Sequence, residues 1–426
     1  MTSWTRVTLK EVTEISKGLS YQGKFLTDHG LPLVNLKCIK AGGGLRPDAT
    51  KPYSGPFKEQ HVVLPGDLVI ANTDLTQSGG VIGSPALVPL LSGHEHGIIS
   101  HHLCRVRALP GAEINQRFLY YRLLSPDFKA FARSVASGTT VLGLRTSDIE
   151  RFEFQIPESN VQERIGRALG GFDDLIENNR RRIELLEETA RLLYREWFVH
   201  YRYPGQEDVP LVDSELGPIP GDWEICRADE VMGVVGGGTP SKKEESYWAD
   251  GDIQWYAPTD LTRTGSMFAL GSSLKINELG LAKSSANLFP AGSVMMTSRA
   301  TIGEISFSTT EACTNQGFIT CVPSEQLSGS HIYFWLEAHV PFFLQVSTGA
   351  TFKELTKSTF RKLPIAIPPV SLEEEFCSLV DPLLQSVLNL LQQQQVLQSS
   401  RDLLLPRLVS GDLDISDLEL NLEAVG

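Results

Sequence analysis

Apolar residues recur at alternating spacings of four and three in two long segments of the chain, with polar residues between them. Sustained over about four heptads, this pattern is typical of helices that pair along a narrow apolar seam. The first segment has the rows Ile165, Phe172, Asn179, Leu186, Leu193 and Leu169, Ile176, Ile183, Ala190, Trp197. The second segment has the rows Phe376, Leu383, Leu390, Leu397, Leu404 and Val380, Val387, Gln394, Arg401. We therefore expect two long helices, over residues 159–202 and 371–410, that pair with each other rather than lie in separate cores.

Two kinds of residue interrupt the heptad pattern. Asn179 and Gln394 are polar residues within the seams, and such residues fix the register of paired helices at some cost in stability. Gly170–Gly171 and Pro382 lie near the starts of the two segments, where they predict a kink or a helix that begins later.

The rest of the sequence has the short-period patterns of mixed α/β domains. Strand-like runs such as "DLVIANT", "CRVRAL", "FEFQIP" and "LPIAIPP" are broken by Gly and Pro, and helical stretches lie between them. We expect an α+β fold with one mixed domain over residues 1–158 and another over 223–370. Residues 203–222 are rich in Pro, Gly and Asp and predict a linker, and residues 411–426 are an acidic C-terminal tail.

The two mixed domains are expected to be copies of one another. Residues 135–165 align with residues 346–376 without a gap, at an offset of 211, with eight identities in 31 positions. Trp4 and Trp223 begin similar segments, and "LPGDLVIANTDLTQSGGVIG" is echoed by "FPAGSVMMTSRATIGEIS". A repeat of this length predicts domain duplication rather than a solenoid.

Each aligned stretch ends where a long helix begins. An Ile-Pro element is followed by a Ser with Gln or Glu three residues later, which gives the pairs Ser159 with Gln162 and Ser371 with Glu374. This spacing predicts a capping box at the start of both helices.

Composition narrows the class of protein. At 426 residues the chain is too long for one ordinary core, which agrees with two domains. No apolar window is long enough to predict a transmembrane helix, and the polar N-terminus predicts no secretory signal.

The six scattered cysteines are expected to be free thiols in the cytoplasm. Neither His94 with His96 nor His101 with His102 has the helical spacing of a metal site, so we expect no bound metal.

The net charge of −13 is unevenly distributed. Residues 1–158 carry 17 Lys and Arg against 14 Asp and Glu, whereas residues 371–426 carry 2 against 10. Strong non-specific binding of DNA by the chain alone is therefore not expected, although local basic loops can still contact DNA.

No catalytic constellation stands out. The chain lacks a G-x-x-x-x-G-K-[ST] phosphate loop, a G-x-S-x-G elbow, an Asn-Pro-Pro-aromatic or Asp-Pro-Pro-aromatic run and a nuclease cluster of paired carboxylates with Lys. The runs "SGGVIG" and "VVGGGTP" do not fit a dinucleotide-binding motif, so we interpret them as turns. These absences favour a non-catalytic protein with two similar binding domains.

The order of motifs resembles a known family. The second half contains "GGGTPSKKEESYWADGDIQWYAPTDL", "SRATIGEIS", "NQGF", "TGATFKELTKSTFRKLPIAIPP" and a heptad helix ending "LLLPRLVSGDL", with shorter echoes in the first half. Together these motifs are similar to those of the specificity subunit of type I restriction–modification enzymes. The first domain departs from the pattern, with "DLTQSGGVIG" where the second has "RATIGEIS".

The resemblance implies a fold and a function. Each domain would be a target recognition domain that reads one half of a bipartite double-stranded DNA target. The helices would form an antiparallel coiled-coil spacer between the domains of this pseudo-twofold internal repeat, with the half-sites about one helical turn apart. Two modification (methyltransferase) subunits would dock on the spacer, and restriction (nuclease/translocase) subunits would join them. S-adenosylmethionine, ATP and magnesium would belong to those partners, so no cofactor is expected in this chain.

Base discrimination requires hydrogen-bonding side chains on loops that enter a groove. In the first domain the candidate DNA-binding residues are Asn72, Thr73, Gln77, Ser78, His101, His102, Thr139, Thr140 and Arg145. In the second domain they are Ser298, Arg299, Thr301, Asn315, Gln316, Thr351 and Lys353. Each could instead hold a turn or cap a helix. The Ile82–Gly83 and Ile302–Gly303 pairs are expected to determine the fold.

Two other functions stay open at this point. A coiled-coil scaffold or adaptor with paired protein-binding domains would share the repeat and the helices, but exchanging its first domain would leave DNA specificity unchanged. A self-contained nuclease or methyltransferase would act on DNA without a partner.

Overall fold

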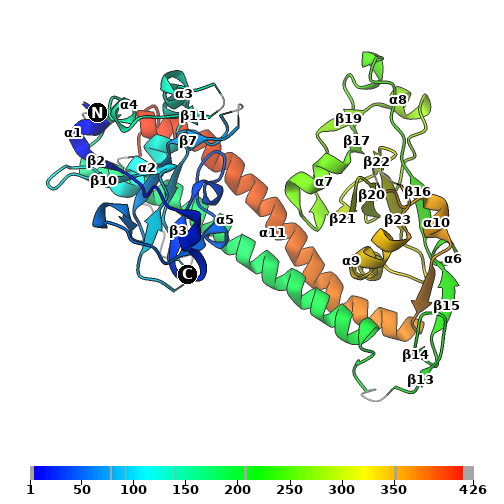
Figure 1. Ribbon diagram of the computed structural model, residues 1–426. Helices are drawn as coiled ribbons and strands as arrows, with labels where there is room; N and C mark the ends of the chain where they lie inside the picture. Colours follow the sequence, from blue (N-terminus) through cyan, green and yellow to red (C-terminus); the bar gives the residue numbers. More distant parts are fainter. Residues whose placement is uncertain are drawn as a thin grey trace. The chain divides into compact units, whose positions relative to one another are not determined.

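The computed structural model describes residues 4–76, 79–91, 93–139, 141–205, 209–349 and 353–415. The chain divides into two compact units: unit 1 is Met1–Asn178 with Gln394–Gly426, and unit 2 is Asn179–Gln393. Each unit contains one mixed domain and part of both long helices (Figure 1). The combination of sheets and helices confirms the α+β fold.

Unit 1 contains two four-stranded sheets. The first has the order β2 (Thr13–Lys17), β10 (Leu103–Ala108), β6 (Leu68–Ala71), β8 (Pro85–Leu87) and is antiparallel throughout. The second has the order β4 (Lys51–Tyr53), β3 (Leu26–Val34), β9 (Gly97–Ile99), β5 (Val62–Val63). Two short ribbons pair β1 (Thr5–Thr8) with β12 (Glu153–Ile156) and β7 (Thr73–Asp74) with β11 (Leu142–Gly143). The domain's helices are α1 (Leu9–Val12), α2 (Gln116–Leu124), α3 (Pro126–Val135), α4 (Thr146–Ile149) and the 3-10 turns Gly23–Phe25, Leu36–Cys38, Pro47–Ala49 and Glu59–His61.

Unit 2 contains a five-stranded and a three-stranded sheet. The first has the order β16 (Gly233–Gly236), β23 (Phe318–Val322), β20 (Val294–Arg299), β21 (Thr301–Ser308), β18 (Phe268–Ala269). The second has the order β19 (Leu274–Ile276), β17 (Ile253–Tyr256), β22 (Ala312–Thr314). Two ribbons pair β15 (Glu224–Arg227) with β24 (Pro364–Ile367) and β13 (Leu211–Val212) with β14 (Ile219–Pro220). The domain's helices are α6 (Ala228–Val231), α7 (Pro258–Thr264), α8 (Glu278–Ala282), α9 (Gly329–Val346), α10 (Lys357–Arg361) and the 3-10 turn Glu245–Tyr247.

The same antiparallel ribbon joins the start and the end of each domain. In unit 1 Thr5 pairs with Ile156, and in unit 2 Glu224 pairs with Ile367. These pairs have the sequence offsets of 219 and 211 that the repeat predicts. The duplication is therefore present in the fold as well as in the sequence.

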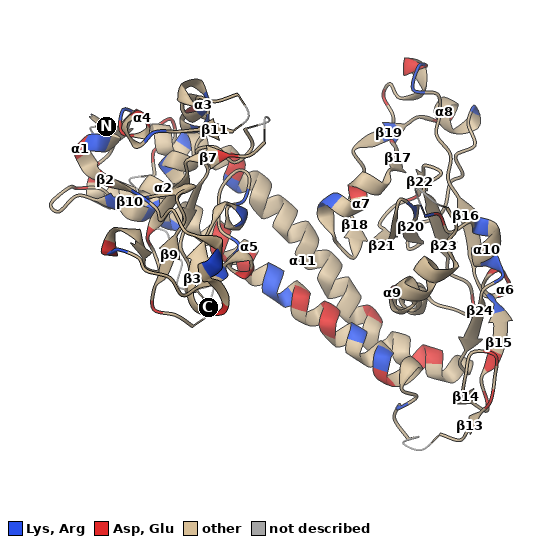
Figure 2. Ribbon diagram, in the orientation of Figure 1, with Lys and Arg blue, Asp and Glu red and all other residues tan. Residues whose placement is uncertain are grey.

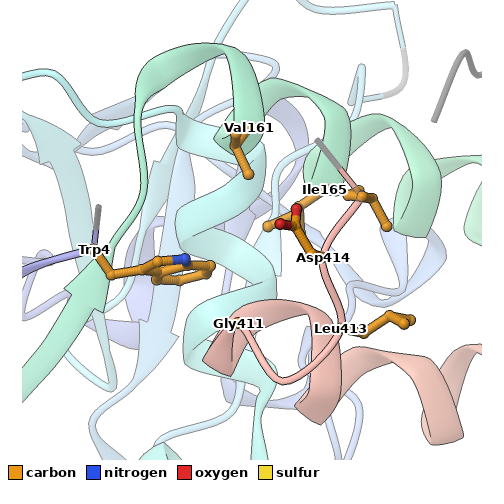
Figure 3. A pocket seen from close by; sticks show the side chains of 7 residues that line it. Trp4, Val161, Ile165, Gly411, Leu413 and Asp414 are labelled. Atoms are coloured by element: carbon orange, nitrogen blue, oxygen red, sulfur yellow. The ribbon is translucent and has the colours of Figure 1, made fainter. Parts of the chain in front are cut away.

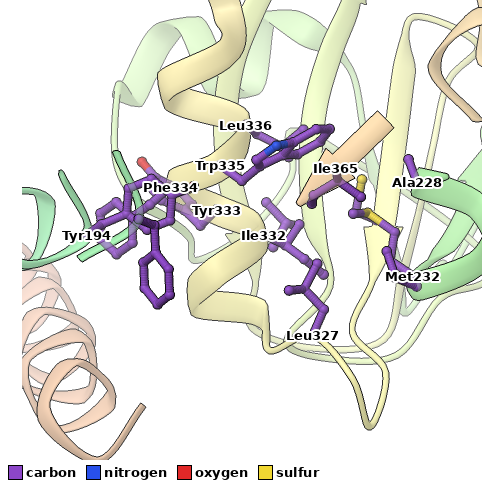
Figure 4. Packing of buried hydrophobic residues seen from close by; sticks show 14 of the residues in the cluster. Tyr194, Ala228, Met232, Leu327, Ile332, Tyr333, Phe334, Trp335, Leu336 and Ile365 are labelled. Atoms are coloured by element: carbon purple, nitrogen blue, oxygen red, sulfur yellow. The ribbon is translucent and has the colours of Figure 1, made fainter. Parts of the chain in front are cut away.

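Both long helices contribute to the core of each unit. In unit 1, Ile165 and Leu169 from one helix and Leu405 and Leu408 from the other are buried with aromatic residues such as Phe118. In unit 2, buried residues of α9 pack against Met232 and Ile365 and against Tyr194 at the end of the first long helix (Figure 4). Burial of this apolar surface holds the helix ends to the domains.

The two long helices run antiparallel within each unit. They are α5 (Ser159–Tyr194), continued by a π-helical turn (Arg195–Val199), and α11 (Val370–Ser410). In unit 1, Arg401 Nη1 lies 2.6 Å from Asp173 Oδ1. In unit 2, Ile183 packs with Val387 and Leu390. All of the predicted seam residues lie within the described ranges, and none of them is exposed. The predicted pairing of the helices is therefore confirmed.

The polar seam residues bond across the helix pair, as expected. The Asn179 side-chain amide donates to Gln393 Oε1 at 3.4 Å in unit 2, and the Gln394 amide donates to the Ile176 carbonyl at 3.0 Å in unit 1. Because each bond requires one particular pairing, these residues oppose a register slip.

The glycine pair does not kink or delay the first helix, since α5 runs through it from Ser159. A Cβ at Gly170 would lie 2.4 Å from Arg117 Cζ, so the glycine makes room for this guanidinium. Arg117 in turn lies 2.9 Å from Asp174, which joins α2 to the helix. The second helix likewise continues through Pro382.

The predicted capping boxes are wrong in their partners. Gln162 Oε1 accepts a hydrogen bond from the backbone N–H of Asn115 at 2.8 Å, at the start of α2. The second copy uses Glu373 rather than Glu374, and Glu373 Oε1 accepts from the N–H of Ser328 at 3.0 Å, at the start of α9. Each long helix therefore caps a helix of its domain, which ties domain and spacer together.

The chain that leaves each long helix packs against the Trp that begins a domain. In unit 1, Gly411 lies on the indole of Trp4 beside a pocket of about 380 Å³ (Figure 3). In unit 2, the ring of Trp223 lies 5.3 Å from that of Tyr201 and 5.8 Å from that of Phe198, measured between centroids. The equivalent contact is thus made in both copies.

Within the described ranges, no helix is long and apolar enough to cross a membrane. The same residues contain no group of three or more His, Cys, Asp or Glu that could hold a metal ion.

Candidate nucleic-acid interface

In unit 1 the end of strand β6 is a junction of three chain segments. The backbone N–H of Asn72 donates to the carbonyl of His102 at 3.0 Å, and the Asn72 carbonyl accepts from the N–H of Leu144 at 2.8 Å. The next residue, Thr73, pairs with Gly143 in the β7–β11 ribbon. The fold therefore brings together candidate segments that are up to 72 residues apart in sequence.

Unit 2 contains the same junction at the end of strand β20. The N–H of Ser298 donates to the carbonyl of Gly317 at 2.8 Å, and the Ser298 carbonyl accepts from the N–H of Leu355 at 2.9 Å. The next residue, Arg299, pairs with Glu354. Every partner in this junction is the repeat equivalent of a partner in unit 1.

Both junctions carry the same closed loop. Ser137 and Gly143 exchange two backbone hydrogen bonds of 3.0 and 2.9 Å, and Thr348 and Glu354 exchange two of 3.1 and 2.8 Å. The second residue of each loop is a glycine, with φ of 126° and 120°. Such backbone is costly for residues with a Cβ, so glycine is required at these two positions.

The Ile-Gly pairs are fold determinants, as predicted. Gly83 has a φ of 75°, and a Cβ there would lie 2.6 Å from the Cβ of Ala132 in α3. Gly303 has a φ of 100°, and a Cβ there would lie 2.6 Å from Cγ1 of Val340 in α9. In both copies the glycine lets a helix pack directly against its backbone.

The side chain of Asn72 corrects one prediction. It is 4% exposed, its Nδ2 donates to Cys104 Sγ at 3.3 Å, and its Oδ1 accepts from Thr73 Oγ1 at 3.1 Å. Burial raises the pKa of the Cys104 thiol to about 11, so the sulfur stays neutral. The Ser298 side chain is also buried, at 3% exposure. We therefore assign Asn72 and Ser298 to the frame of the junction and not to base contact.

His101 and His102 lie side by side at the unit 1 junction, with 3.9 Å between ring centroids and an angle of 38° between the ring planes. Burial, together with the nearby His101 and Lys17, lowers the pKa of His102. His102 is therefore neutral at pH 7, and a neutral imidazole carries one donor and one acceptor. His101 and His102 are both half-buried, and the ring centroid of Tyr21 lies 6.3 Å from that of His101.

The remaining unit 1 candidates divide into two groups. Thr139 and Arg145 are exposed, and Thr73 is half-buried. Gln77, Ser78 and Thr140, together with Thr351 of unit 2, lie outside the described residues.

Three unit 2 candidates are charged or polar groups at the surface. Arg299 and Thr301 are exposed, and Arg299 Nε lies 3.8 Å from Glu354 Oε2. Lys353 is exposed and its Nζ donates to the Leu344 carbonyl at 3.1 Å. Because these partners are weak surface contacts, a phosphate or base could replace them at little cost.

Asn315 and Gln316 differ in what their side chains can do. Asn315 Oδ1 accepts from the N–H of Gly317 at 2.8 Å, so it holds its own turn. Gln316 is exposed, and its Oε1 accepts a hydrogen bond from Thr239 Oγ1 at 2.6 Å. Thr239 follows the triple glycine and was missed in the sequence, where the run was interpreted only as a turn. Three consecutive glycines before a hydroxyl residue were the available signal.

Basic residues are concentrated beside the unit 2 junction (Figure 2). Lys357 and Arg361 are the first and last residues of α10. The equivalent positions in the first copy are Thr146, the first residue of α4, and Glu150, the residue that follows α4. Arg361 Nη2 donates to the Val234 carbonyl at 2.9 Å, which fixes it against the sheet. At these two positions the second copy therefore carries two positive charges where the first copy carries none.

Comparison with known proteins gives this geometry a family. A family model described as the type I restriction modification DNA specificity domain matches the chain twice, over residues 1–188 and 220–397. The chain belongs to this family. The double match also confirms the internal repeat, and membership makes the chain a DNA specificity subunit of the type I restriction–modification class, a family without catalytic activity of its own.

Individual relatives agree with the assignment. The chain is 27% identical over 318 residues to the type I restriction enzyme MjaIX specificity subunit of Methanocaldococcus jannaschii, covering 73% of this chain and 72% of the relative. It is 22% identical over 356 residues to the HindI specificity subunit of Haemophilus influenzae, covering 70% of this chain and 77% of that one. In fold it resembles the crystal structure of a type I S subunit from M. genitalium, with a TM-score of 0.63, 15% identity and 96% of each chain covered.

Proposed function

We propose that the two junctions of this specificity subunit are its two DNA readers. Each would read one half of a bipartite target in double-stranded DNA. The observation that carries the proposal is the duplicated junction, in which the same backbone hydrogen bonds present different side chains. His101 and His102 in the first copy correspond to Gln316 and Gly317 in the second. One frame with two sets of side chains is what a protein needs to recognise two different short sequences.

The proposed readers lie within target recognition domains 1–158 and 223–370, separated by the linker 203–222 and the helices. The exposed candidates Thr73, Thr139 and Arg145, with His101 and His102, would serve the first half-site. Arg299, Thr301, Gln316 and Lys353 would serve the second. Gln77, Ser78, Thr140, Thr351 and Asn315 complete the set of proposed contacts.

The long helices would set the spacing of the half-sites and dock two modification (methyltransferase) subunits. Exposed apolar residues support docking, because they recur in both helices at the repeat offset of 211. Leu185 is 70% exposed and Leu192 45% exposed on α5, and Val396 is 64% and Leu403 66% exposed on α11. Two equivalent apolar stripes would suit two copies of one partner.

Catalysis would reside in the partners. Methyl transfer would use S-adenosylmethionine in the modification subunits, and cleavage would use ATP and magnesium in restriction subunits. The complex would work in the cytoplasm, where its DNA lies.

The test exchanges the first reader. Residues 1–158 are replaced by the same domain of a relative with a different target, the chain is assembled with its methyltransferase subunits, and methylated sites are sequenced. The expected result is a change in one half-site, with the other half-site and the spacing unchanged. An unchanged target would favour a scaffold or adaptor role instead.

A further inference from the structure

The triple-glycine segment of unit 2 is fixed against the second reader. The N–H of Gly238 donates to the Thr314 carbonyl at 2.8 Å, and the indole N–H of Trp255 donates to the Gly238 carbonyl at 2.9 Å. A Cβ at Gly237 would lie 2.1 Å from the Asn315 carbonyl oxygen. The glycines therefore allow an approach that no larger residue could make, and two hydrogen bonds hold the segment there.

This close approach places Thr239 next to Gln316. Thr239 Oγ1 donates to Gln316 Oε1 at 2.6 Å, while the Gln316 side chain is otherwise exposed. Within the part of the chain that the structure describes, no group accepts a hydrogen bond from Gln316 Nε2. The Thr239 hydroxyl thus holds the Gln316 amide at its oxygen, while the rest of the amide stays exposed.

We propose that Thr239 is a positioning residue that holds the Gln316 amide in one orientation toward DNA. This inference rests on the proposed function of the second reader and adds a residue to it. A glutamine amide pairs with adenine through one donor and one acceptor, at N7 and N6. Because an amide oxygen has two lone pairs, Gln316 bonded to Thr239 still offers its NH₂ donors and one acceptor site. Thr239 therefore acts on specificity by fixing where these groups lie, and not by removing one of them.

The experiment uses the full chain assembled with its methyltransferase subunits. Methylation is measured on a duplex library randomised over both half-sites, for wild type, Q316A, T239V and T239S. Valine keeps the shape of threonine without the hydroxyl, and serine keeps the hydroxyl. Thermal unfolding and the methylation pattern of the first half-site report on folding in every variant.

We expect Q316A to relax one position of the second half-site. T239V should weaken the base preference at that same position, on the order of tenfold, since no hydroxyl then holds the Gln316 amide. T239S should retain the wild-type preference, and every other position should stay unchanged. A merely structural role of Thr239 would instead lower methylation of all targets together.

The outcomes distinguish a failure of the positioning role of Thr239 from a failure of the proposed second reader. If Q316A relaxes a position and T239V does not alter the preference there, the positioning role is overturned while the reader stands. If Q316A changes no position in a folded complex, the assignment of Gln316 to the second reader fails, and the positioning role fails with it.

Discussion

The joint between domain and helix in unit 2 contains a buried contact between a histidine and a carboxylate that the first copy lacks. His331 Nδ1 lies 2.7 Å from Glu373 Oε2, and the two side chains are 2% and 9% exposed. The equivalent positions in the first copy are Phe118 and Gln162, which carry no charge. The chain thus contains its own uncharged version of the same joint, and this version provides a matched set of substitutions.

We expect the single changes to be costly and the double change to be cheaper than their sum. Replacing His331 with Phe leaves a buried carboxylate without its partner, which costs about 3 kcal/mol. Replacing Glu373 with Gln keeps an oxygen for the Ser328 N–H and loses the charged bond, which costs about 1–2 kcal/mol. The double variant has the Phe and Gln side chains that the first copy carries at these positions. We therefore expect its free energy of unfolding to fall by only about 1–2 kcal/mol, which corresponds to a coupling energy of about 3 kcal/mol between the two residues.

The assay is urea unfolding of the four proteins, monitored by tryptophan fluorescence of unit 2, in a double-mutant cycle. Glu373→Asp and Ser358→Ala provide controls for a shifted carboxylate and for a remote surface change. Additive losses within about 0.5 kcal/mol would refute the claim that the pair acts as a unit. So would a double variant that is less stable than the His331→Phe variant.

The same pair predicts a pH dependence. Burial acts to raise the pKa of Glu373, but His331 and the hydrogen bonds from Ser328 outweigh it and hold the pKa below its usual value. A carboxylate with a lowered pKa stabilises the fold above its unfolded pKa, and this contribution is lost as pH falls through the folded pKa. Acidification should therefore destabilise wild type more than Glu373→Gln. Equal losses in the two proteins would contradict the assignment.

Further predictions concern docking, packing and spacing. Leu185→Glu combined with Val396→Glu should reduce the number of methyltransferase subunits bound in native mass spectrometry, while the free energy of unfolding changes by less than about 0.5 kcal/mol. Gln395→Glu is the control for an added surface charge. An unchanged number of bound subunits would exclude these apolar residues as the docking surface. Gly303→Ala should lower the free energy of unfolding in urea by about 3 kcal/mol, because the new Cβ meets both a positive φ and a clash with a neighbouring side chain. Gly292→Ala has a positive φ but open space around it, so it should lower the free energy by about 1 kcal/mol. Equal losses in the two variants would rule out the clash at Gly303. One heptad added to each long helix lengthens the spacer by about 10 Å and should change the half-site spacing seen by methylation sequencing, and an unchanged spacing would remove the helices as the ruler.

The elements that the sequence predicted best are those in which one periodic signal extends over many residues. Seams of four heptads predicted α5 and α11, and neither Gly170 nor Pro382 breaks them, because tertiary packing outweighs local propensity. The repeat predicted which segments are equivalent. It could not predict that Gln162 and Glu373 cap helices of their domains, because that contact joins residues more than 40 positions apart.

The sequence predicted which segments contain the candidate DNA-binding residues, but not which of their side chains are exposed. Residue type placed Asn72 and Ser298 among the side chains that meet DNA, whereas the structure buries both. Sequence cannot distinguish a polar residue that faces solvent from one that bonds a buried neighbour, since both carry the same groups. Thr239 was missed for the converse reason, because its importance comes only from a partner 77 residues away.

The two junctions are held together by backbone hydrogen bonds, so their exposed side chains can change while the frame stays the same. The junctions use the N–H and C=O of Asn72 and of Ser298, together with backbone groups of their partners. Any residue except proline supplies these groups, so the frame places little demand on the exposed side chains around it. Glycine is required only where φ is positive or a helix approaches closely. Side chains such as His101 and Gln316 can therefore be exchanged without altering the junction, and under the proposed function one duplicated frame would hold two specificities.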